Sequence, residues 1–370
     1  MQQRVIISQD IEHDLAQAIA ETEHDRVFVL TDDITQECCL PKVAVLFAKH
    51  NATIITIRHN DTNKTLATLA DVWTALQRGG ATRHSLLVNL GGGMVTDLGG
   101  FAAATFKRGI NFINIPTTLL AMVDAAVGGK TGINFGGLKN EVGAFANARY
   151  VIVNTCFLDT LDTANLCSGY AEMLKHSLIS NAQMWAEHVN FDILQPDLAE
   201  LQRMVAASIT VKEHIVADDP HEHGIRKALN FGHTIGHALE EFSMQQPGGA
   251  VVSARLLPLA RARTAPKNTL LHGYAVAFGL IGELYISARK AGFPTARLHQ
   301  TTRFIRENYG AMAFTCDDYP TLLNLMRHDK KNTSGTINFT LLHDIGDIRI
   351  NQTATDEEIR EALDFIREGY

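Results

Sequence analysis

Short apolar runs alternate with longer amphipathic segments along the first part of the chain. The runs have the length and the Val, Ile and Leu content of buried strands, at residues 26–30, 52–57, 86–90, 111–115 and 150–153. Between them, residues 41–50, 64–78 and 95–106 show helical patterns. Because strands that alternate with helices form mostly parallel sheets, we predict a Rossmann-like α/β fold with helices on both faces of the sheet.

The pattern changes near residue 158, after which long amphipathic segments dominate and β-branched runs are scarce until residue 336. A chain of 370 residues exceeds what one hydrophobic core usually supports. We therefore predict an α/β domain over residues 1–158 and a mainly α-helical domain over residues 159–370. Residues 245–269 are rich in Ala, Arg and Pro, lack periodicity, and are expected to form an inserted loop.

Composition narrows the class of protein. The net charge of −7 argues against general binding to nucleic acid, which requires a basic surface. No run of about 18 apolar residues is present, so no membrane span is expected, and the N-terminus lacks the pattern of a secretory signal. The five cysteines form no CxxC pair. This composition is typical of a globular protein from a reducing cytoplasm.

One polar stripe indicates a functional site. Arg226, Asn230, His233 and His237 are spaced by four, three and four residues, which predicts that they share one face of a single helix. A solvated helix face is the alternative interpretation, but such faces are mostly Glu and Lys. Thr234 stands where a zinc protease of the His-Glu-x-x-His type has its glutamate, so that class is excluded. Glu172 and His272 are further candidate ligands for a zinc site built on His233.

Two glycine-rich segments could approach phosphate. Gly91, Gly92 and Gly93 follow a predicted strand and precede a predicted helix, although a tight strand-to-helix turn is the alternative. They do not match the G-x-G-x-x-G fingerprint. The second segment surrounds Lys130, but Asp124 occupies a position where a P-loop requires glycine, so a P-loop is rejected.

Five blocks of sequence in order resemble the 3-dehydroquinate synthase family: residues 91–109, 115–140, 168–179, 224–240 and 270–279. In that family an α/β domain binds NAD and a helical domain binds a divalent metal, Zn²⁺ or Co²⁺. The resemblance implies a lyase of the shikimate pathway of aromatic amino-acid biosynthesis. Such an enzyme converts 3-deoxy-D-arabino-heptulosonate 7-phosphate to 3-dehydroquinate and phosphate.

The resemblance also implies roles for individual residues. NAD would be bound by Gly91, Gly92, Gly93, Asp97, Thr117, Thr118, Lys139, Asp32, Asp61 and Lys64. The metal ligands would be Glu172, His233 and His272, so that His237 is not a ligand and moves protons. The substrate would be held by Lys130, Asn140, Lys212, Arg226, Asn230 and Lys330 or Lys331, with Lys175, Glu222 and Asp124 in the same catalytic site. Arg108 would reach the site of the neighbouring subunit, which implies a homodimer.

Other functions remain open at this stage. A sister sugar-phosphate cyclase uses similar chemistry, but its substrate has no carboxylate and such an enzyme should lack part of the set Lys212, Arg226 and Asn230. A polyol dehydrogenase would release NADH in proportion to product. A non-catalytic NAD-binding relative, disabled by residues 245–269, would hold no zinc and release no phosphate.

Overall fold

The computed structural model describes residues 3–369 apart from 246–250, 253–269 and 329–335. The chain divides into two compact units, which are described separately. Unit 1 comprises residues 1–161 and 197–209, and unit 2 comprises residues 162–196 and 210–370. The sequence pattern gave no sign that residues 197–209 belong with the first part of the chain.

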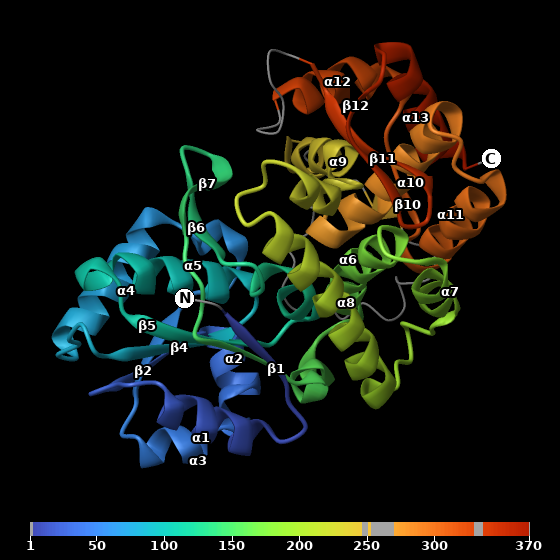
Figure 1. The fold of residues 1–370 in the computed structure, drawn as a ribbon. Helices are drawn as coiled ribbons and strands as arrows, with labels where there is room; N and C mark the ends of the chain where they lie inside the picture. The colour runs from blue at the N-terminus through green and yellow to red at the C-terminus, as the bar shows by residue number, and fades with distance from the viewer. Residues whose placement is uncertain (1–2, 246–250, 253–269, 329–335, 370) are drawn as a thin grey trace. The chain divides into compact units, whose positions relative to one another are not determined.

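Unit 1 is built on a six-stranded sheet in which every strand pair is parallel (Figure 1). The strand order is β1 (Arg4–Ile7), β8 (Tyr150–Val153), β5 (Asn111–Pro116), β4 (Leu86–Gly91), β2 (Val27–Asp32) and β3 (Thr53–Ile57). The central strands β2 and β4 are buried along their whole length, as apolar runs in a parallel sheet should be. The predicted α/β class is confirmed, and β1 is the strand that the pattern did not predict.

Helices cover both faces of this sheet, with α4 and α5 on one face and α1 and α3 on the other (Figure 1). The helical elements are α1 (Ile11–Glu21), α2 (Asp33–Cys38), η1 (Leu40–Lys42), α3 (Ala44–Lys49), η2 (Asp61–Asn63), α4 (Leu66–Arg78), α5 (Gly93–Thr105), η3 (Phe106–Arg108), η4 (Ala121–Ala125) and η5 (Thr155–Thr160). The helix predicted over residues 41–50 is divided, because Val43 leaves helical geometry between η1 and α3.

A two-stranded antiparallel hairpin of β6 (Lys130–Phe135) and β7 (Leu138–Phe145) completes unit 1. Its turn contains Gly136 and Gly137, which have φ of 61° and 83°. These angles suit glycine because a side chain would be strained there. Lys130 therefore begins a strand and not the helix that follows a P-loop, in agreement with the rejection of that motif.

Unit 2 is mainly helical, which confirms the predicted character of the second part of the chain. Its elements are α6 (Thr163–Leu178), α7 (Ala182–Asn190), the end of α8 (Leu198–Asp218), η6 (Ile225–Asn230), α9 (His233–Gln245), α10 (His272–Lys290), α11 (Thr295–Tyr309), η7 (Cys316–Asp318), α12 (Tyr319–His328), α13 (Asp356–Glu368), and the hairpin of β11 (Asn338–Asp344) and β12 (Asp347–Thr353). Residues 166–178 of α6 and 273–284 of α10 are buried on all sides and form the centre of the unit.

The prediction that a single helix carries Arg226, Asn230, His233 and His237 is wrong. Arg226 and Asn230 lie on the 3₁₀ helix η6, whereas α9 begins at His233. Gly232, with φ of 79°, separates the two helices. The four side chains therefore do not form one continuous helical stripe.

Two sequence predictions concern residues outside the described part of the chain. Most of the predicted insertion at 245–269 is not described, except for Gln245 at the end of α9 and β9 (Val251–Val252), which pairs with β10 (Ala311–Met312). Lys330 and Lys331 are also not described. Among the described residues, no helix is both long and apolar enough to cross a membrane.

Candidate active site

The carboxyl ends of β4 and β5 bring together the three glycines and two threonines predicted to bind NAD. Strand β4 ends at Gly91 and helix α5 begins at Gly93. The Thr117 N–H, just after β5, donates to the Gly91 carbonyl at 3.0 Å. A Cβ atom on Gly92 would lie 3.0 Å from Thr118 Cγ2, so the two segments approach closely. A helix N-terminus beside such a turn is a favourable place for phosphate.

A network of polar side chains joins the other predicted cofactor residues of unit 1. The buried Lys64 ammonium donates to Asp97 Oδ2 and to Asn140 Oδ1, both at 2.5 Å. Lys139 Nζ lies 3.7 Å from Asp61 Oδ2. Burial raises the pKa of the Asp97 carboxyl, although the Lys64 charge opposes that shift. Residues from η2 and its C-terminal end, from α5 and from β7 thus meet around Lys64 and Asp61.

Asp32 lies at the carboxyl end of β2, the neighbour of β4 in the sheet. Its Oδ1 atom accepts hydrogen bonds from the N–H groups of Ile34 and Thr35, at 3.0 and 2.8 Å. The side chain therefore caps helix α2, which is the usual function of Asp at this position. Burial raises the pKa of this carboxyl.

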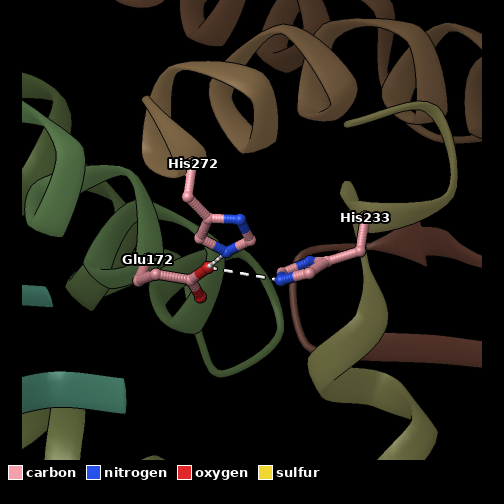
Figure 2. Close-up of side chains that lie close together, drawn as sticks. All are labelled: Glu172, His233 and His272. Atoms are coloured by element: carbon pink, nitrogen blue, oxygen red, sulfur yellow. Dashed lines mark ion pairs between the residues drawn. The ribbon is translucent and has the colours of Figure 1, made fainter. Parts of the chain in front are cut away.

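Three side chains from distant parts of the sequence meet in unit 2. Glu172 comes from α6, whereas His233 and His272 are the first residues of α9 and α10. Figure 2 shows both rings facing the Glu172 carboxylate, with Oε1 at 3.3 Å from His233 Nε2 and 3.4 Å from His272 Nε2. One ligand atom of each residue lies within 4.8 Å of the other two, which is a spacing suited to a metal ion.

The charge of the Glu172 carboxylate is maintained inside the protein. Burial opposes its ionisation, but Lys175 and His233 outweigh that effect and hold the pKa of Glu172 well below its usual range. Lys175 lies on the same helix, is also buried, and forms an ion pair with Glu172 Oε2. An ionised carboxylate is the form that binds a divalent cation.

The Nδ1 atoms of both imidazoles, which are not the atoms nearest Glu172, have hydrogen-bond partners. His233 Nδ1 lies 3.1 Å from the Phe231 carbonyl oxygen, and His272 Nδ1 lies 3.0 Å from Glu240 Oε2. When each ring is neutral, both contacts favour the tautomer in which Nδ1 donates and Nε2 carries the lone pair that a metal would bind. This arrangement is typical of histidines that bind zinc, so the residues fit a Zn²⁺ or Co²⁺ ion. Glu240 was not predicted from the sequence.

The Glu240 carboxylate also affects the charge of its partner. Burial lowers the stability of a charged imidazole, but Glu240 and Glu172 outweigh burial and raise the pKa of His272 to about 10. His237 lies beside this group, with its ring centroid 5.3 Å from that of His233 and 5.9 Å from that of His272. This third imidazole, next to the two candidate ligands, could transfer protons without binding the metal.

A polar loop in unit 2 brings together residues predicted to bind the substrate. Asp219 accepts the backbone N–H groups of His223 at 3.0 Å, Gly224 at 2.7 Å and Arg226 at 3.1 Å. Beside this loop, the Asn230 amide at the end of η6 donates to Glu222 Oε1 at 2.6 Å. The sequence did not predict the role of Asp219 in shaping this loop.

Two of the predicted substrate residues in unit 2 are buried cations. Arg226 is 2% exposed and donates from Nη1 to the Pro220 carbonyl, and Lys212 is 6% exposed. The remaining predicted substrate residues among those described lie in unit 1: Asp124 on η4, Lys130 at the start of β6, Asn140 on β7, and Arg108 after α5.

Family models cover most of the chain. Residues 54–168 match the model of the 3-dehydroquinate synthase N-terminal domain, and residues 169–257 and 260–332 match that of the C-terminal domain. The 3-dehydroquinate synthase of Parabacteroides distasonis is 51% identical over 369 residues, covering 100% of this chain and 99% of that protein. That of Clostridium tetani is 32% identical, covering 92% of this chain and 86% of that protein.

Solved structures share the fold. A 2-deoxy-scyllo-inosose synthase complexed with carbaglucose-6-phosphate, NAD⁺ and Co²⁺ superposes with a TM-score of 0.81 at 23% identity, over 100% of this chain and 96% of the other. The 2-epi-5-epi-valiolone synthase of Streptomyces hygroscopicus subsp. jinggangensis, with NAD⁺ and Zn²⁺ bound, gives 0.80 at 23% identity, over 100% and 98%.

The fold is therefore shared with these two cyclases. Within it, the family models and the full-length similarity to the Parabacteroides distasonis protein are decisive. The chain belongs to the 3-dehydroquinate synthase family.

Proposed function

We propose that this protein is a 3-dehydroquinate synthase, a carbon–oxygen lyase that converts 3-deoxy-D-arabino-heptulosonate 7-phosphate to 3-dehydroquinate and phosphate. The observation that carries this proposal is the 51% identity to the Parabacteroides distasonis enzyme over nearly the whole of both chains. The convergence of Glu172, His233 and His272 supports it. The product would enter the shikimate pathway.

NAD and a divalent metal, Zn²⁺ or Co²⁺, are the cofactors that we propose. Two proteins of the same fold were solved with NAD⁺ and one of these ions. When bound, NAD supplies a transient oxidation that is later reversed, and the metal supplies a positive charge that acidifies the substrate hydroxyls. Gly91, Gly92 and Gly93 with Thr117 and Thr118 would hold the dinucleotide phosphates. Lys139, Asp97, Lys64, Asp61 and Asp32 would bind the rest of that cofactor.

The substrate carries a carboxylate and a phosphate, and separate residues would bind the two groups. Lys212, Arg226 and Asn230 would bind the carboxylate, because a guanidinium can donate two parallel hydrogen bonds to it. Lys130 and Asn140, with Lys330 or Lys331, would bind the phosphate. Lys175 and Asp124 would contact ring hydroxyls. Each of these interactions fixes the ring relative to the cofactors.

Proton movement would be the task of His237, with Glu222 in the same site. Elimination of phosphate requires that a proton leave the carbon next to the transient ketone and that the C–O bond to the phosphate break, with the phosphate taking the electron pair. An imidazole can exchange a proton near neutral pH. The ring centroid of His237 lies 5.3 Å from that of His233. Ring opening and an intramolecular aldol closure then give the product.

We also propose that the enzyme is a cytoplasmic homodimer in which Arg108 reaches the phosphate in the neighbouring subunit. The β6–β7 hairpin supports an interface on unit 1, since it exposes four large apolar side chains: Phe135, Leu138, Val142 and Phe145. All five cysteines are free thiols, which agrees with a reducing compartment. The mass of the protein in solution, with and without a Phe145→Glu substitution, would test the dimer.

The activity can be tested by incubating the purified protein with the heptulosonate phosphate, NAD and Zn²⁺. Phosphate release and the absorbance band of NADH are followed together. Phosphate release without lasting NADH is expected. Lasting NADH would identify a dehydrogenase, turnover of a hexose phosphate instead would identify a sister cyclase, and NAD binding without any turnover would identify a non-catalytic relative.

A further inference from the structure

Helix α9 has a polar partner at its N-terminus that comes from another helix. The first N–H groups of a helix have no partner within the helix and must be satisfied from outside. Glu283, in the middle of α10, accepts three of them. Its Oε2 atom receives the Gly232 N–H at 2.7 Å, and its Oε1 atom receives those of Thr234 at 2.9 Å and Ile235 at 3.2 Å.

Only a carboxylate satisfies this arrangement well. Glu283 is 0% exposed, so each of the three donors would lose a hydrogen bond without compensation by water if the acceptor were removed. A negative charge at this position also interacts favourably with the positive end of the helix dipole. In a glutamine, one of the two oxygen atoms is replaced by an NH₂ group, which would face an N–H donor.

The two helices are packed too closely for another group to take the place of Glu283. A Cβ atom on Gly279 would lie 1.9 Å from the Gly232 carbonyl oxygen, and one on Gly236 would lie 2.9 Å from the Ala275 carbonyl oxygen. The contact is therefore backbone against backbone. The position of the N-terminus of α9 depends on this contact and on Glu283.

The residue fixed in this way is a candidate metal ligand. His233 lies between Gly232 and Thr234, both of which donate to Glu283. The relationship is reciprocal, because Glu240 of α9 holds His272 at the start of α10. Each of the two helices thus supplies one imidazole and one carboxylate that positions the imidazole of the other helix.

We propose that Glu283 is a positioning residue for the metal centre, which directs His233 Nε2 toward Glu172. The inference rests on the proposed function in one respect, namely that these residues bind Zn²⁺ or Co²⁺. Glu283 does not touch the metal or the substrate. Its effect is exerted through the backbone of residues 232–235.

The test uses metal binding and not turnover. The zinc dissociation constant of the full-length protein is measured by competition with a chelator, and the visible spectrum is recorded after cobalt substitution. The variants are Glu283→Gln and Glu283→Asp. The control is Ser287→Ala, because Ser287 is buried on the same helix. Its hydroxyl donates to the backbone carbonyl of Glu283 and accepts the backbone N–H of Leu342, so it makes neither bond with α9.

Both Glu283 variants are expected to bind zinc roughly 10- to 100-fold more weakly and to change the cobalt spectrum, as loss of support for a metal ligand does. Ser287→Ala should lower Tm and leave the zinc affinity and the cobalt spectrum unchanged. If Glu283→Gln does not fold, Glu283→Asp, which keeps the charge, decides the result. Unchanged zinc affinity and cobalt spectrum in a folded variant would overturn the proposal, as would a wild-type protein that binds neither metal. Normal metal binding without phosphate release would instead refute the proposed activity and leave this inference standing.

Discussion

His272 and Glu240 are 32 residues apart in sequence, yet the Nδ1 atom of the ring lies 3.0 Å from Oε2 of the carboxylate. Glu240→Gln should weaken zinc binding by about 10- to 100-fold, because an amide orients the ring less strongly and lowers its basicity as a ligand. Chelator competition measures this change. Glu241→Gln is the matched control, since Glu241 is the next residue on α9 and is exposed. Equal affinity in the two variants would contradict the role of Glu240.

Arg226→Ala should reduce kcat/KM for the heptulosonate phosphate by about 100-fold, or roughly 3 kcal/mol, because a buried charge-assisted contact with the carboxylate is lost. Arg226→Lys should restore only part of the activity, since an ammonium cannot donate two parallel hydrogen bonds. The neighbouring Lys227→Ala serves as the control. An analogue that lacks the carboxylate should be turned over by wild type and Arg226→Ala at similar rates; a large difference would argue against the proposed clamp.

The cysteines should differ strongly in their reactivity. Burial raises the pKa of Cys39 to about 11 and that of Cys167 to about 12, so at pH 8 only about one in a thousand Cys39 thiols and one in ten thousand Cys167 thiols are ionised. Cys316 is exposed. Iodoacetamide at pH 8 should therefore label Cys316 first, and peptide mass mapping would show it. Labelling of Cys167 in the native protein as fast as Cys316 would contradict its burial.

Two glycines on α10 should respond differently to alanine. Each substitution gains up to about 1 kcal/mol in helix propensity. A Cβ atom on Gly279 meets the backbone oxygen of Gly232 at 1.9 Å, whereas one on Gly282 meets the methyl ends of Ile235 and Ile366 at 2.7 and 2.8 Å. Gly279→Ala should thus lower the free energy of unfolding by about 2 kcal/mol, and Gly282→Ala by less. Urea denaturation measures both, and equal losses would refute the distinction.

Strands β2, β4, β5 and β8 could be predicted because they are buried along almost their whole length and are therefore mostly apolar. The run at residues 111–115 corresponds to β5 (Asn111–Pro116), and that at 150–153 to β8. The break after Asn230 could not be predicted in this way. The periodicity of polar residues continues across Gly232. The structure shows that Gly232 has a positive φ and that a Cβ atom there would lie 2.7 Å from Leu280 Cδ2 of α10.

The candidate metal ligands illustrate a second limit. Glu172, His233 and His272 lie in separate segments, so periodicity alone could not unite them, and the resemblance to a family was required. Glu283 was missed, although a signal existed. It is the only charged residue among residues 275–287, where an acidic side chain has no solvated face to occupy. Glu240 gave a weaker sequence signal, because it is followed by Glu241 and the pair resembles a surface position.

Residues 197–209 belong to unit 1 but follow residues 162–196 of unit 2. Within unit 1, the Gln202 amide donates to the Ser8 carbonyl at 2.8 Å and accepts from the Thr155 hydroxyl at 2.9 Å. During synthesis on the ribosome, the first unit can therefore complete its packing only after a part of the second has already emerged. A fragment that stops at residue 161 would lack these contacts, so neither half can be excised by a single cut in the polypeptide.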